Sequence, residues 1–213
     1  MLLPARLALY FVPMLFSLTV HEWAHALTAH WLGDDTAKER GRLTLNPIPH
    51  LDFFGSLLLP GFAIAAGAPV FGWARPTPIN AARFRPSVNP RFGLAFTSLA
   101  GPFSNLLIGF MAGLLLALVR HSGVHWSWAG PVLTAFMSIN AALAVFNVLP
   151  IPPLDGSRLV LGLLPRDAAI TYARLARVAP LLLVALLLLP ALSRVITVPM
   201  NDLYDLFATV ASL

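Results

Sequence analysis

VHEWAHA, at residues 20–26, places a metal-binding pattern inside an apolar stretch of the chain. The pattern is H-E-x-x-H, and on a helix residues four positions apart lie on the same face, so His21 and His25 can hold one ion. Glu22 projects beside them and is placed to act as a general base. Two core histidines satisfied by backbone carbonyls are the alternative interpretation, and the setting of the stretch argues against it.

The composition indicates an integral membrane protein. Of 213 residues, 58% are hydrophobic and 11% are charged, against about 25% charged residues in a soluble domain. Lys and Arg exceed Asp and Glu by 14 to 9, but they fall in short loops between apolar runs, where they orient a membrane protein. We therefore expect no nucleic-acid partner. The chain has no cysteine, so a metal would have to be held by histidine and carboxylate.

The apolar runs predict an all-α polytopic membrane protein with about four transmembrane helices. The predicted spans are residues 7–32, 92–119, 132–149 and 175–196. Residues 55–71 are short for a span and are interrupted by proline and glycine, which favours a re-entrant segment. Residues 42–46 alternate in polarity and predict a short β element. We expect a single domain over residues 1–213, with a catalytic core at about 7–160 and a last span with an amphipathic tail at 166–213.

The third metal ligand is predicted from the chemistry of catalytic zinc. Such a site normally takes three protein ligands, and two histidines with one carboxylate are a known set. Asp155 is the candidate, because it follows the span at 132–149 on a backbone that three prolines keep from being helical.

The distribution of basic residues predicts the topology. Asp155 can meet His25 on one side of the membrane only if residues 55–71 are re-entrant. With re-entry, eleven of the fourteen basic residues lie on one side, whereas a full span divides them 9 to 5. The eleven are Lys38, Arg40, Arg42, Arg75, Arg83, Arg85, Arg91, Arg158, Arg166, Arg174 and Arg177. Because positive charge marks the cytoplasmic side, we expect an extracytoplasmic N-terminus and a site that opens to the cytoplasm.

Three motifs in this order resemble those of the site-2 protease family of intramembrane zinc metalloproteases. They are H-E-x-x-H at residues 21–25, G-P-x-x-N at 101–105 and NVLPIPPLDG at 147–156. The resemblance is greatest to small bacterial or archaeal members that lack PDZ and CBS domains. It implies a site-2 protease-like core that binds one Zn²⁺ per chain.

The resemblance also implies roles for individual residues. His21, His25 and Asp155 would be the zinc ligands, and Glu22 would be the general base. Asn105 and Asn147 would support the substrate or the cavity. Asn140, on the same helical stripe as Asn147, is expected to face inward and is assigned to the same group.

We therefore expect a zinc-dependent intramembrane endopeptidase of a prokaryotic cell membrane. Its partners would be the lipid bilayer and a membrane-spanning protein substrate, which it would cleave in regulated intramembrane proteolysis. One alternative is a non-catalytic metal-binding protein or transporter, and another is a membrane zinc peptidase that acts on non-spanning peptides. The placement of Glu22 favours an enzyme over a transporter.

Overall fold

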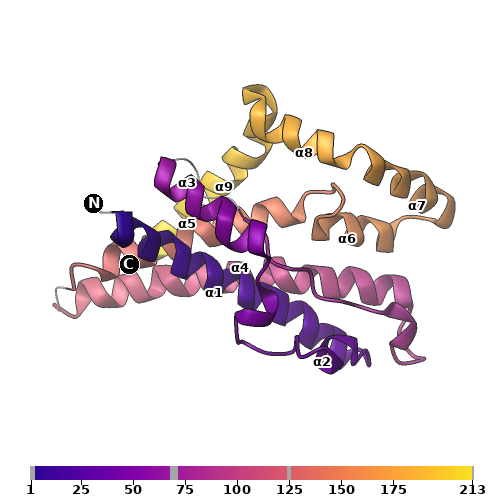
Figure 1. Ribbon diagram of the computed structural model, residues 1–213. Helices are drawn as coiled ribbons and strands as arrows, with labels where there is room; N and C mark the ends of the chain where they lie inside the picture. Colours follow the sequence, from indigo (N-terminus) through magenta and orange to yellow (C-terminus); the bar gives the residue numbers. More distant parts are fainter. Residues whose placement is uncertain (1–2, 68–71, 124–125, 213) are drawn as a thin grey trace.

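The computed structural model describes residues 3–67, 72–123 and 126–212, and these residues form a helical bundle (Figure 1). The four longest helices are α1 (Leu3–Trp31), α4 (Pro90–His121), α5 (Ala129–Val148) and α9 (Pro190–Val210). The shorter helices are α2 (Thr36–Glu39), α3 (Leu59–Ala66), α6 (Asp155–Leu163), α7 (Arg166–Ala173) and α8 (Ala179–Leu188). Single turns and a π-helix complete the elements: η1 (Ile48–His50), η2 (Phe53–Leu58), η3 (Ala81–Arg83) and η4 (Arg174–Arg177).

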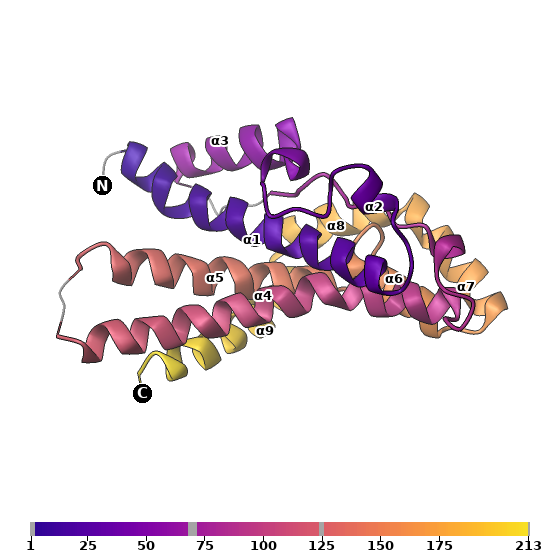
Figure 2. The same cartoon turned by 90° about the horizontal axis from the view of Figure 1, so that it is seen from below.

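Helices α1, α4 and α5 form the centre of the bundle, where α4 runs beside both of the others (Figure 2). Small side chains allow this close approach, as is usual for helices packed in a membrane. Ala26 and Ala141 are completely buried. Asn89 begins α4 by accepting a hydrogen bond from the N–H of Arg91, and Pro90 occupies the first helical position, where its missing N–H costs nothing.

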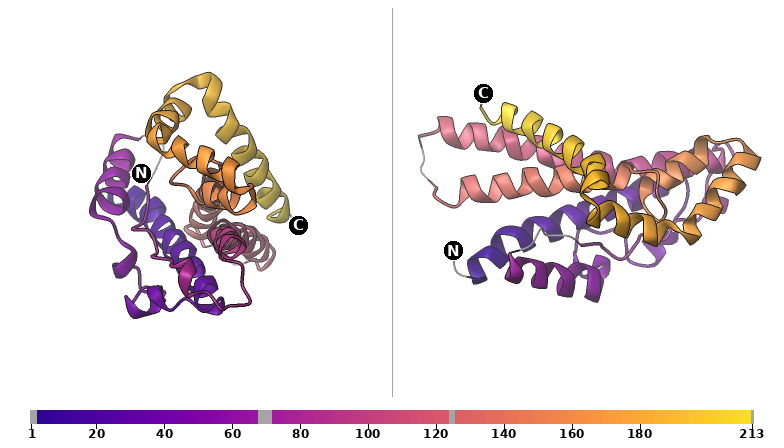
Figure 3. Two further views of the ribbon diagram at one scale, coloured as in Figure 1. Left: turned by 90° about the vertical axis from the view of Figure 1, so that its right-hand side faces the viewer. Right: turned by 90° about the horizontal axis from the view of Figure 1, so that it is seen from above.

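The predicted spans at 7–32, 92–119 and 132–149 correspond to α1, α4 and α5. These three helices are long and apolar enough to cross a bilayer, and a bent pair formed by residues 166–177 and 179–186 could add a fourth crossing. The all-α class is therefore confirmed for the described residues. The amphipathic helix α9 packs on α4 and α5, on the side away from α3 (Figure 3).

The apolar segment of η2 and α3 runs back along α1 toward its N-terminal end. Asp52 caps its beginning by accepting hydrogen bonds from the N–H groups of Phe54 and Gly55. The apolar segment ends at Gly67, whose positive φ suits a glycine at a helix C-terminus. Gly67 lies close to Arg6. The last residues of the predicted re-entrant segment, 68–71, lie outside the described part of the chain.

Residues 72–80 then run in the opposite direction, extended along α1. Ala74 packs against Met14 and Leu18, nearer the middle of α1. The N–H of Arg75 donates to the carbonyl of His50 over 2.8 Å. This hydrogen bond joins the chain before the apolar segment to the chain after it. Re-entry of residues 55–71 in a membrane stays a prediction.

Two sequence-based predictions differ from the structure. Residues 42–46 form bends and no strand. A strand needs backbone hydrogen bonds from a neighbouring strand, and none joins residues 43–46 to another segment of the described chain. The span predicted at 175–196 is broken between α8 and α9 at Leu189, since Pro190 starts a new helix. The amphipathic tail predicted after this span consequently belongs to α9.

Candidate metal centre

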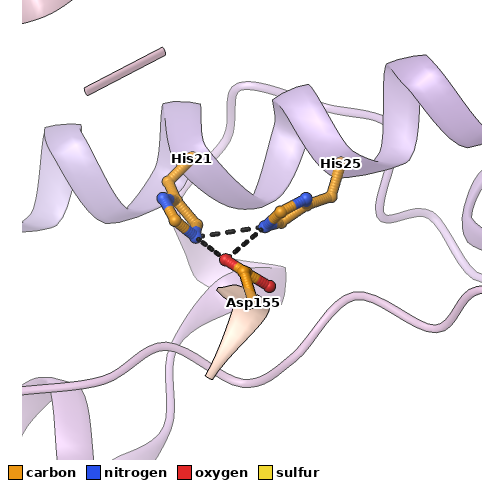
Figure 4. Close-up of side chains that lie close together, drawn as sticks. All are labelled: His21, His25 and Asp155. Carbon is orange, nitrogen blue, oxygen red and sulfur yellow. Dashed lines mark hydrogen bonds and ion pairs between the residues drawn. The ribbon is translucent and has the colours of Figure 1, made fainter. Parts of the chain in front are cut away.

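His21, His25 and Asp155 converge at the centre of the bundle (Figure 4). The Nε2 atoms of the two histidines are 3.1 Å apart, and Asp155 Oδ2 lies 3.0 Å from His21 Nε2 and 3.1 Å from His25 Nε2. All three residues are buried. The structure therefore brings together the three ligands predicted from the sequence, two from α1 and one from the start of α6.

A close approach of α6 to α5 places Asp155. Gly156 follows it, and a Cβ atom at that position would lie 2.0 Å from the carbonyl oxygen of Val148. Only glycine permits this contact without displacing the backbone. The carboxylate is thereby delivered to the two histidines directly after α5 ends.

Hydrogen bonds to the other ring nitrogens fix both imidazoles. His21 Nδ1 lies 2.7 Å from Asn105 Oδ1, and His25 Nδ1 lies 2.7 Å from the carbonyl oxygen of Thr97. Both partners are acceptors, so each Nδ1 must carry the proton. Each Nε2 then presents a lone pair to the cluster, which is the state that a metal ligand requires.

A chain of buried side chains sets the orientation of Asn105. The amide of Asn140 donates to the backbone carbonyl of Phe136 and to Ser17 Oγ, both over 2.8 Å. Because a carbonyl can only accept, Asn140 must turn its Oδ1 toward Asn105, whose Nδ2 donates to it over 2.8 Å. Asn105 is left with its Oδ1 facing His21. Both amides are completely buried, so α4 and α5 together hold the His21 ring.

The cluster fits a zinc ion in its spacing. With Zn–N and Zn–O bonds of about 2.0–2.1 Å, tetrahedral ligand atoms lie roughly 3.3 Å apart, close to the 3.0–3.1 Å measured here. Gly101 provides the remaining room. A Cβ atom at this position would stand 2.4 Å from His25 Nε2 and 2.5 Å from His21 Nε2, in the space that an ion on these nitrogens needs.

Glu22 is held apart from the three clustered ligands. Its Oε2 accepts a hydrogen bond from the N–H of Thr77 over 2.7 Å, and Thr77 Oγ1 donates to the carbonyl of Glu22 over 3.0 Å. The extended segment at 72–80 thus orients the carboxylate beside the cluster. Thr77 carries no sequence signal for this role, since it becomes a partner of Glu22 only when this segment lies along α1.

The three asparagines predicted to support the site differ in what they contact. Asn105 bonds to His21, and Asn140 acts through Asn105. Asn147 donates to the carbonyl of Leu143 on its own helix, so no recorded contact joins its side chain to the cluster. The backbone carbonyl of Thr97 was not predicted, because a main-chain acceptor leaves no mark in the sequence.

The length of α5 sets the distance between the cluster and two tryptophans at the other end of this helix. Its 20 residues extend over about 30 Å, the thickness of a bilayer's hydrocarbon core. Exposed Trp126 and Trp128 stack at its beginning, as aromatic residues do at a membrane interface. Asp155 follows shortly after the opposite end. The cluster therefore lies about one α5 length from the Trp126–Trp128 stack, where α5 ends and α6 begins.

The fold and the cluster define a polytopic membrane protein with an internal metal centre, and comparison with known proteins gives its family. The profile of peptidase family M50 matches residues 118–190, which include Asp155. Curated relatives called "Putative zinc metalloprotease" include YwhC of Bacillus subtilis, 45% identical over 72% of this chain and 68% of its own length.

Rip2 of Mycolicibacterium smegmatis, which carries the same description, is 35% identical over 84% of this chain and 66% of its own. Rip2 of Mycobacterium tuberculosis is 39% identical over 67% and 52%. No solved structure matches the chain. The chain belongs to peptidase family M50, the site-2 protease family, as its three motifs predicted.

Proposed function

We propose that the chain is a zinc-dependent endopeptidase that cleaves membrane-spanning proteins close to the cytoplasmic edge of the bilayer. The observation that carries this proposal is the placement of a buried His–His–Asp cluster about one hydrocarbon thickness from the Trp126 end of α5. A peptide bond can reach such a site from within the membrane, and water can reach it from the nearby interface. The names of the relatives support zinc as the ion.

Metal binding and proton transfer would be carried out by different residues. His21, His25 and Asp155 would hold the ion, which when bound polarises the peptide carbonyl and makes water more acidic. Glu22 would take a proton from the water as its oxygen attacks the carbonyl carbon. When the C–N bond breaks, Glu22 would return that proton to the leaving nitrogen, leaving a carboxylic acid and an amine.

The substrate would have to unwind locally, because a helix keeps its carbonyls in its own hydrogen bonds. The experiment that tests the function is co-reconstitution of the chain with a single-span protein, followed by mass mapping of the products. We expect a cut in the half of the span nearer the cytoplasm, and none after zinc is chelated. Cleavage confined to soluble peptides, or zinc transport without cleavage, would contradict the proposal.

Asn105 would act as a positioning residue for His21. We expect Asn105→Leu to weaken zinc binding about 10- to 100-fold, the usual cost of losing a partner of a metal-bound histidine. Asn147→Leu is the matched control, and its zinc affinity should stay within about two-fold because Asn147 bonds to its own helix. Titration with a zinc-selective dye measures both. Equal affinities in the two variants would remove Asn105 from this role.

The topology would comprise a re-entrant segment between α1 and α4, with the N-terminus outside the cytoplasm. Single cysteines can test it, since the chain has none. Ala82 and Ser127 are both exposed. We expect a membrane-impermeant maleimide to label Ala82→Cys only from the cytoplasmic side and Ser127→Cys only from the outer side. Labelling of both from one side would refute the arrangement.

A further inference from the structure

A cavity rich in arginine lies beside the segment that holds Glu22. It has a volume of about 220 Å³ and is lined by Arg40, Arg42, Pro49, Arg75, Pro76 and Pro78. We call it the arginine pocket. None of its residues belongs to the metal centre. The connection is through the chain, because Arg75 and Pro76 directly precede Thr77.

No ion pair neutralises the arginines of the pocket within the described part of the chain. Arg42 is only 6% exposed. Its guanidinium donates to the carbonyls of Pro49, Arg75 and Pro76, which hold the group without cancelling its charge. Burial and the nearby Arg75 lower the pKa of Arg42, and the charge of Glu22 only partly opposes this shift.

Carboxylates in the neighbourhood have other partners. The ion pair recorded between an arginine and a carboxylate in the described residues joins Arg83 to Glu39, and no ion pair is recorded there for Arg40, Arg42 or Arg75. A cavity lined by three arginines, none of which forms an ion pair in the described residues, has the chemistry of an anion site. Phosphate suits it, because guanidinium groups bind phosphate oxygens through paired, charge-assisted hydrogen bonds.

The surroundings place this pocket at the surface of the bilayer. The hydrogen bond from Arg75 to His50 puts it where the chain enters and leaves the apolar segment of η2 and α3. Next to it along the chain, Ile48 is 71% exposed, and Phe53 and Phe54 are 63% and 65% exposed. Large apolar side chains with this exposure belong in lipid. The pocket also lies near the metal centre along the chain, because the next residue, Thr77, bonds to Glu22, and the proposed function places that centre at the interface.

We propose that the arginine pocket binds the phosphate of an anionic phospholipid headgroup. The phosphate would lie among the three guanidinium groups, and the acyl chains would extend along the exposed apolar residues at 48–54. Anionic lipids of the cytoplasmic leaflet attract basic residues in this position. The polar lining and the adjacent lipid-facing side chains together favour a headgroup over a free anion.

Occupancy of the pocket would affect Glu22, a consequence that rests on the proposed function. Arg75 and Pro76 line the pocket, and the next residue donates to the Glu22 carboxylate over 2.7 Å. A phosphate between the arginines would relieve their mutual repulsion and steady this stretch. Cleavage should consequently be faster in membranes that contain anionic lipid.

Lipid binding is tested on the full chain carrying Glu22→Gln, so that the result does not depend on cleavage. The protein is placed in phosphatidylcholine nanodiscs containing a small fraction of phosphatidylglycerol, and retained lipid is counted by native mass spectrometry. Arg40→Gln with Arg75→Gln removes two cations from the pocket and leaves Arg42 to hold the loops. Arg174→Gln with Arg177→Gln removes the same charge from exposed positions in η4, on another side of the bundle (Figure 1).

We expect the pocket variant to retain at least about 10-fold less phosphatidylglycerol and the η4 variant to stay within about two-fold of the parent. Lipid bound in a specific pocket should be retained better than lipid attracted only by exposed basic residues. Equal losses in both variants would overturn the pocket. Complete displacement of the lipid by millimolar inorganic phosphate, or by an acidic peptide, would overturn the headgroup assignment.

The functional consequence is measured separately with Glu22 present. Phosphatidylglycerol should raise the cleavage rate several-fold for the natural sequence and for the η4 variant, but not for the pocket variant. Lipid retention without any cleavage would contradict the proposed peptidase while leaving the pocket supported. Cleavage with equal lipid response in all three proteins would refute the link between the pocket and Glu22.

Discussion

Gly101→Ala is expected to abolish zinc binding and peptidase activity together, while the protein remains folded. The added methyl group would lie 2.4–2.5 Å from both Nε2 atoms, where real contacts do not occur. The two rings could move away only by giving up their bonds to Asn105 and to the Thr97 carbonyl. We expect at least about a 100-fold loss of zinc affinity. Displacing both histidines should weaken zinc binding more than removing the hydrogen-bond partner of one of them.

Zinc content by elemental analysis and cleavage of a reconstituted single-span substrate measure the two effects. Gly130→Ala is the matched control. It makes the same change in α5, where no atom lies within 4 Å of the new Cβ, so zinc content and activity should be unchanged. A Gly101→Ala protein with full zinc occupancy would show that the ion does not lie between these two nitrogens.

The residues of the metal cluster could be predicted because each carries chemistry in its own identity. His21 and His25 stand four apart on a helix, and Asp155 is a carboxylate on a proline-broken segment at membrane depth. The requirement that they meet also predicted that residues 55–71 are re-entrant, and this stays a prediction. Spacing and charge were sufficient for these inferences because a metal and a membrane both impose simple geometry.

Other features could not be predicted because they depend on which segments become neighbours. The N–H of Thr77 and the carbonyl of Thr97 are main-chain groups that any residue would supply. Residues 42–46 have the alternation of a strand, but no described segment pairs with residues 43–46 through its backbone. Arg42 instead turns its side chain inward to three carbonyls. Pro190 was visible in the sequence, yet a proline inside an apolar run can either kink a helix or start a new one.

Glu22→Gln is expected to reduce cleavage about 10²- to 10⁴-fold, the usual contribution of a general acid–base group, without loss of zinc. Glutamine keeps the size of the side chain, and its carbonyl can still accept the hydrogen bond from Thr77, but it cannot take a proton from water. Zinc should be retained because Glu22 does not belong to the His21, His25 and Asp155 cluster. The measurements are the rate of cleavage of the single-span substrate and the zinc content of the same preparation.

Glu39→Gln is the control that the sequence itself provides, because Glu39 is the chain's other glutamate. Glu39 pairs with Arg83 at the surface, and this pairing lowers the pKa of Glu39. Because exposed ion pairs contribute little to stability, replacing Glu39 should change the cleavage rate by less than about two-fold. Both glutamine variants remove one negative charge, but only Glu22→Gln removes the proposed proton acceptor. Comparing their cleavage rates therefore separates proton transfer from the effect of charge alone. Cleavage that survives in Glu22→Gln would assign the base elsewhere. Loss of zinc in that variant would instead show that Thr77 and Glu22 serve to shape the metal centre, which the zinc measurement distinguishes from a chemical role.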